Sequence, residues 1–130
     1  MRTHRLILFL FSLFAALSSY AQPVADEQLA AQYFQQGDYA KAILYYEKLH
    51  NKQPTPYYYE QLYKSYVALK EFDPAEKLVK EQMRRANGDP GPIIDMGKLY
   101  LLQDEEDKAN KEFDKALKQI IENFEKANPD

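Results

Sequence analysis

An alanine that recurs at a nearly fixed interval constrains the fold of this chain more than any other feature. Ala42, Ala75 and Ala109 are separated by 33 and 34 residues. Around each of them apolar residues fall at helical spacing, and turn signals divide each interval into two helices. A period of this length is typical of stacked helical hairpins, because one hairpin cannot bury its apolar face alone. We therefore expect an all-α fold.

Local signals predict where the helices begin and end. Gly37-Asp38 ends one helix and caps the next, and Thr55-Pro56 supplies a capping hydroxyl followed by a first-turn proline. The segment from Asp73 to Glu76 predicts a helix that begins with Asp73 as its N-cap and Glu76 as the capping-box acid. Proline and glycine at 87–92 interrupt the chain again. The expected hairpins cover about 24–54, 55–88 and 89–127, with 128–130 as a tail.

The last helix continues past the third repeat and leaves apolar residues to be covered. Ile120, Ile121 and Phe124 fall on an extension that we expect to end near Ala127. A repeat stack needs its final apolar face covered. Three arrangements follow from the residues: the extension folds back as a cap, the chain is the first portion of a longer repeat protein, or the extension forms the seam of a homodimer.

Residues 1–21 have the layout of a signal peptide. Arg2 and Arg5 precede an uncharged apolar core at 6–17, and Ser19 and Ala21 are small residues placed for cleavage before Gln22. The core is shorter than the roughly 18–20 apolar residues that cross a membrane. We expect cleavage and no stable membrane insertion afterwards, with an uncleaved anchor as the alternative. The segment resembles Gram-negative signal peptides, which indicates the periplasm, or secretion.

Composition excludes several classes of function. The chain has 20 acidic and 17 basic residues and a net charge of −3, so a nucleic-acid partner is not expected. It has no cysteine, which excludes disulfides and a lipidated N-terminal cysteine. It shows no glycine-rich phosphate loop, and its acidic cluster at 104–107 lacks the alternating ligands of a calcium loop. We expect no catalytic residue, no cofactor and no metal.

The three repeats resemble the tetratricopeptide repeat family over about residues 26–117. The residues that carry the resemblance are Tyr33, Gly37, Asp38, Tyr39, Ala42, Tyr46 and Pro54; Tyr59, Leu62, Tyr66, Phe72 and Ala75; and Gly97, Tyr100, Ala109, Phe113 and Ala116. The resemblance implies a right-handed α-solenoid of three helix-turn-helix hairpins with an extended C-terminal helix. It also implies a scaffold that binds a protein or peptide partner. Tyr63, Gln82 and Glu106 depart from the family pattern, which puts the local packing angle of the later hairpins in question.

The family resemblance implies that the first helix of each hairpin lines a concave groove. The candidate partner-binding residues on that mapping are Phe34, Tyr57, Glu60, Lys64, Val67, Ile94, Lys98 and Leu101. Phe34, Val67 and Leu101 have an alternative role as packing between helices, whereas a lysine in a groove has no packing reason to be there. Some family members hold a carboxylate with a basic clamp, but Glu27 and Ala31 occupy its first positions here.

A run of three tyrosines offers a second class of binding surface. Tyr57, Tyr58 and Tyr59 are consecutive, and consecutive helical residues point about 100° apart, so they cannot all be buried on one face. We expect Tyr57 or Tyr58 to be exposed. An exposed tyrosine favours a protein interface. Stacking on a sugar ring is the alternative, which would make the domain a glycan-binding module.

Overall fold

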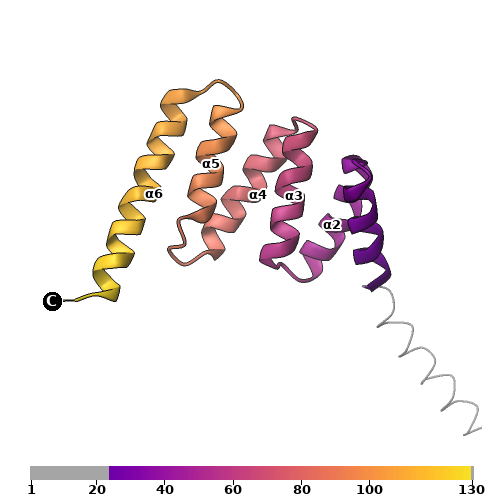
Figure 1. Cartoon of the computed structure of the whole chain (residues 1–130), viewed down its shortest axis with the longest axis horizontal. Coiled ribbons are helices and arrows are strands. Elements are labelled where there is room, and N and C mark those ends of the chain that lie inside the picture. The colour runs from indigo at the N-terminus through magenta and orange to yellow at the C-terminus, as the bar shows by residue number, and fades with distance from the viewer. Residues whose placement is uncertain (1–23, 130) are drawn as a thin grey trace, which may run out of the picture. The chain divides into compact units, whose positions relative to one another are not determined.

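The computed structural model describes residues 24–129, and within them all regular structure is helical. The helices are a stretch over residues 24–35, α2 (Tyr39–Lys52), α3 (Pro56–Ala68), α4 (Phe72–Arg85), α5 (Gly91–Leu101) and α6 (Glu106–Ala127). They pair in sequence as three hairpins, of which the third has the long second helix seen in Figure 1. The expected all-α fold is confirmed. The expected signal peptide at 1–21 lies outside the described residues.

The chain divides within α3 into two compact units, Met1–Tyr58 and Tyr59–Asp130. In the first unit, the helix over residues 24–35 turns into α2 at Gly37, whose φ of 75° is a conformation that favours glycine. The Asp38 carboxylate then accepts the backbone N–H of Lys41 at 3.3 Å and caps α2. The expected stop and cap at Gly37-Asp38 are confirmed.

The second unit contains the rest of α3 and all of α4, α5 and α6. In Figure 1, α5 runs antiparallel to α6 beside it, and α5 also packs against α4. The approach of α5 to α6 is close at Gly97, where an added Cβ would lie 2.5 Å from the ring of Phe113. A side chain at Gly97 would therefore force α5 and the ring of Phe113 apart.

The three recurring alanines are fully buried. Ala42, Ala75 and Ala109 each have 0% of their surface exposed. A methyl group at a helix crossing lets two backbones approach, and larger side chains fill the remaining space to the density of a protein interior. Other buried residues of the core are Tyr46, Leu49, Leu62, Tyr66, Val79 and Leu99. The predicted pivot positions are thus confirmed as buried.

The predicted helix starts are correct in one case and wrong in another. α3 begins at Pro56, and Thr55 accepts the N–H of Tyr58 at 3.2 Å, as expected. α4 begins at Phe72 after Glu71, so Asp73 is not its N-cap. The reason is the preceding turn, in which Lys70 adopts a φ of 58° and the Glu71 N–H bonds to the Tyr66 carbonyl. Asp73 instead lies in the first turn, where it complements the helix dipole.

The extension of the last helix stays helical to Ala127 and does not fold back as a cap. It leaves large apolar side chains in solvent: Leu117 is 56% exposed, Ile120 44%, Ile121 49% and Phe124 68%. The fold-back arrangement is therefore wrong for the residues that the structure describes. Among these residues, no helix combines the length and the apolar character that a membrane span requires.

Replacement of Ala42 by leucine tests the buried pivot. Because Ala42 has no exposed surface, the added carbons must displace neighbouring helices, and we expect the free energy of unfolding to fall by about 1–3 kcal/mol. Ala40→Leu is the matched control, since Ala40 lies on the same helix and is exposed. Chemical denaturation of both variants measures the difference. An equal stability of the two variants would remove Ala42 from the role of pivot.

Candidate functional site

Two tyrosines of α3 join that helix to α5 through one aspartate. The Tyr59 hydroxyl donates to Asp95 Oδ2 at 2.9 Å, and the Tyr63 hydroxyl donates to the Asp95 carbonyl oxygen at 3.2 Å. Asp95 also accepts Lys98 Nζ at 3.2 Å. These bonds fix the spacing of α3 and α5 within the second unit. They also create a surface on which most of the candidate groove residues lie.

We call this surface the α3–α5 surface and define it by the candidate residues on its two helices. Its members are Glu60, Lys64 and Val67 of α3 and Ile94, Lys98 and Leu101 of α5. Leu101 is 46% exposed, whereas Val67 and Ile94 are half-buried. The surface therefore offers an exposed apolar side chain together with exposed charges, a mixture that suits a protein partner.

Each lysine of the α3–α5 surface has a carboxylate partner on its own helix. Lys64 pairs with Glu60 at 2.5 Å, and Lys98 pairs with Asp95. The Lys64 and Lys98 side chains remain 52% and 56% exposed. An exposed pair of this kind contributes only about 0–1 kcal/mol. A carboxylate of a bound partner can therefore compete for both lysines at low cost.

The other candidate groove residues lie in the first unit and are described there. Phe34 is half-buried and packs edge to face on Tyr39 and Tyr46, with ring centroids 5.4 and 6.4 Å apart. Its contacts match the alternative packing role considered for it. Tyr57 is 45% exposed, so the expectation that the tyrosine run exposes at least one ring is confirmed.

Hydroxyl contacts fix the first two tyrosines of the run, Tyr57 and Tyr58, within the first unit. The Tyr57 hydroxyl lies 3.3 Å from the Tyr46 hydroxyl, and the half-buried Tyr58 donates to Glu27 Oε2 at 3.3 Å. Tyr59, by contrast, is buried and belongs to the second unit. It is part of the group formed by Tyr59, Tyr63, Asp95 and Lys98, which we call the Asp95 cluster. Tyr57 consequently offers a partly exposed ring whose orientation is set by its neighbours.

Three tyrosine hydroxyls, two beside Asp95 and that of Tyr46 in the first unit, stay protonated well beyond neutral pH. Burial, reinforced by the negative charge of Asp95, raises the pKa of Tyr63 to about 12. The same two causes raise the pKa of Tyr59 further. Burial also raises the pKa of Tyr46, with a contribution from its hydrogen bond to Tyr57. All three hydroxyls therefore act as stable hydrogen-bond donors or acceptors and not as proton-transfer groups near neutral pH.

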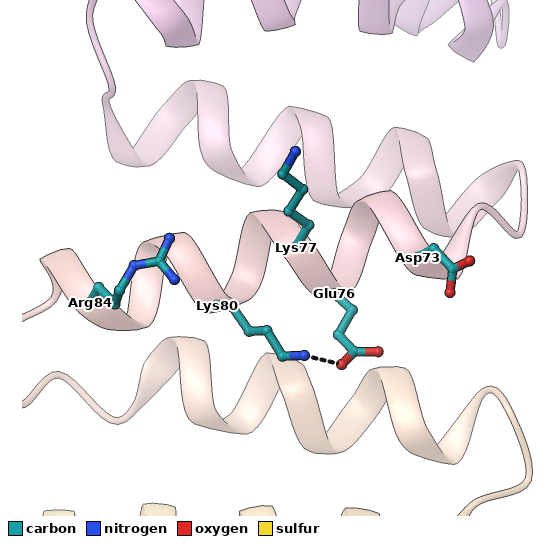
Figure 2. Close-up of a pocket in the computed structure, with 5 residues that line it drawn as sticks. All are labelled: Asp73, Glu76, Lys77, Lys80 and Arg84. Atoms are coloured by element: carbon teal, nitrogen blue, oxygen red, sulfur yellow. Dashed lines mark ion pairs between the residues drawn. The ribbon is translucent and has the colours of Figure 1, made fainter.

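A shallow trough of about 440 Å³ lies on α4 and is lined by Asp73, Glu76, Lys77, Lys80 and Arg84. Figure 2 shows Lys80 turned toward Glu76, with which it pairs at 2.5 Å, while Lys77 points away from that pair. Every lining residue belongs to one helix, so the trough is open surface and not an enclosed ligand site. Within residues 24–129, no group of three or more potential metal-ligating side chains occurs.

The sequence did not reveal the Asp95 cluster. Tyr59 is one of the residues that carry the family resemblance, and Tyr63 is a departure from the family pattern. Asp95 was not among the candidate residues, because a hydrogen bond between positions 36 residues apart leaves no local signal. The departure at Tyr63 was the available clue, since a large polar-tipped ring in place of a small residue needs a partner when buried.

Comparison with known families bears on the first hairpin. Residues 27–56 match the tetratricopeptide repeat family model. This match supports the predicted tetratricopeptide character, and it covers the segment with the strongest sequence resemblance. The match ends at the first residue of α3. A search of curated proteins finds no match to the chain.

The raised tyrosine pKa values predict a loss of stability at alkaline pH. Above pH 10 the unfolded chain releases phenolic protons that the native chain keeps, so the free energy of unfolding falls as pH rises from 10 toward 12. Denaturation at several pH values measures this slope. Tyr63→Phe should flatten it, because the substitution removes a hydroxyl whose pKa is raised in the native chain. A slope that is the same in the wild-type chain and the Tyr63 variant would contradict the proposed origin.

Proposed function

We propose that this protein is a tetratricopeptide-type scaffold that binds a protein or peptide partner through the α3–α5 surface. The observation that carries the proposal is the Asp95 cluster, which holds α3 and α5 at a fixed spacing beneath exposed groups of mixed character. The tetratricopeptide match supports it, because repeats of this family typically mediate protein interactions. A preformed surface also binds at a lower entropic cost than a mobile one.

The partner that suits this surface carries acidic groups beside an apolar side chain. Lys64 and Lys98 can exchange their own carboxylates for those of a partner, and Leu101 offers an apolar contact between α5 and the bound chain. Charged contacts on an exposed surface contribute mainly to specificity and to the rate of encounter. Binding should therefore weaken as the salt concentration rises.

Reversal of the two lysine charges tests the α3–α5 surface. We expect Lys64→Glu combined with Lys98→Glu to weaken partner binding by about tenfold or more, since each change replaces an attraction with a repulsion. The measurement is affinity capture from a cell-envelope extract, followed by titration of the captured protein. Lys41→Glu combined with Lys115→Glu is the matched control, because these lysines are 57% and 62% exposed and each also pairs with a carboxylate three residues before it.

Two results would contradict this assignment. If both double variants hold the same partner equally well, the α3–α5 surface is not the binding site. If binding survives charge reversal and added salt but is lost in Tyr57→Ala, the glycan-binding alternative gains support, since Tyr57 has a ring that is 45% exposed. Circular dichroism of each variant establishes that the helices are retained.

We further propose that the protein is exported and that cleavage before Gln22 releases it to the periplasm. Arg2, Arg5 and the apolar core at 6–17 support this proposal. The intact mass of the protein from a fractionated Gram-negative host is the measurement, and a periplasmic product that begins at Gln22 is the expected result. A product that keeps residue 1 and stays with the membrane would favour the uncleaved anchor.

A further inference from the structure

The exposed apolar residues of α6 form a single stripe that adjoins its contact with α5. Leu117, Ile120, Ile121 and Phe124 follow the spacing i, i+3, i+4, i+7 of one helical face. At about 100° per residue, the centre of this stripe lies about 80° around the helix from the buried side that carries Ala109 and Ala116. We call these four residues the α6 stripe. Their exposure is not explained by packing within the described residues.

The apolar area that the α6 stripe exposes is large enough to contribute to binding of a partner. For large side chains of roughly 150–250 Å², the exposed fractions of its four members leave roughly 300–500 Å² of apolar surface in water. The largest apolar patch on an ordinary monomer is about this size and is often a functional surface. Two such stripes facing each other would bury roughly 600–1,000 Å², which reaches the lower bound of specific interfaces once flanking residues are added.

We propose that a second copy of this chain covers the α6 stripe, with the two α6 helices antiparallel. The spacing of the stripe is the same when it is read from either end. A two-fold axis that passes between Ile120 and Ile121 therefore places Ile120 of one copy opposite Ile121 of the other. It also places Leu117 opposite Phe124 of the second copy, so a large ring meets a smaller side chain at both ends. A two-fold interface of this kind uses the same patch on both copies and closes as a dimer.

Charges beside the α6 stripe favour the antiparallel arrangement. Lys118 and Glu125 lie on its solvent-facing edge, and the side chain of neither makes an ion pair or hydrogen bond within residues 24–129. Lys108 and Lys115 of the same helix, in contrast, are both paired. The antiparallel arrangement brings Lys118 of each copy within about one helical turn of Glu125 of the other. In a parallel two-fold pair, Lys118 and Glu125 of one copy would lie on the opposite edge of the interface from those of the other copy, so this attraction would be absent.

The dimer would give the scaffold two α3–α5 surfaces in one assembly. If the proposed function holds, a partner with two binding segments gains avidity from the dimer without any new contact. The dimer itself does not depend on that function, because the α6 stripe and the α3–α5 surface share no residue. Loss of the dimer in an experiment is therefore distinguishable from loss of partner binding.

Single-cysteine variants test the orientation, since the chain has no cysteine of its own. Under mild oxidation Ile121→Cys should form a covalent dimer, because the two thiols lie beside the two-fold axis. Leu117→Cys alone should not, because its thiols would be about 10 Å apart along the helices, beyond the reach of a disulfide. A mixture of Leu117→Cys and Phe124→Cys should form the mixed dimer. Equal cross-linking of Leu117→Cys and Ile121→Cys would overturn the antiparallel arrangement.

Sedimentation equilibrium of the chain expressed from its full sequence tests the dimer itself. We expect a reversible monomer–dimer equilibrium that Phe124→Glu weakens by about tenfold or more. Leu44→Glu is the matched control, since Leu44 is 66% exposed and Phe124 is 68% exposed, and Leu44 lies on α2. A monomer at every concentration, or equal weakening by both variants, would overturn the proposal. Both variants change exposed side chains, so helicity should be retained in each.

Discussion

The close crossing of paired helices at a buried alanine is the constraint on which the rest of this structure depends. Ala42, Ala75 and Ala109 are fully buried, and each occupies the same place in its repeat. A larger side chain at such a crossing would push the helices apart and open gaps that the surrounding core could not fill. Gly97 shows how little room remains elsewhere in the second unit, because even one added carbon would meet the ring of Phe113.

Tyrosine hydroxyls form a second level of order that this close packing makes possible. A buried tyrosine ring contributes a large apolar area, but its hydroxyl needs a partner. Tyr59 and Tyr63 meet that need at Asp95, and Tyr100 meets it at Glu76 of α4, 3.4 Å away. Each bond joins two helices within the second unit. The same bonds that satisfy buried polar atoms therefore set the spacing of the α3–α5 surface.

The helix ends show which boundaries could be predicted from neighbouring residues alone. The stop at Gly37, the cap at Asp38 and the start at Pro56 were all predictable, because each depends on residues within one turn. The start of α4 was not, because the left-handed turn at Lys70 decides it and leaves Asp73 inside the helix. Lysine gives no local indication of that turn. The Asp95 cluster escaped prediction for a related reason, since its members come from separate helices.

The sequence by itself determined the repeat, the helical class and the approximate helix boundaries, because periodicity and capping are local properties of a chain. Only the tertiary structure decided which polar groups meet across helices, as at Tyr59 and Asp95, and which apolar residues stay in water, as at Phe124. Both outcomes depend on the angle and distance between helices, and these arise from packing as a whole and from no single segment.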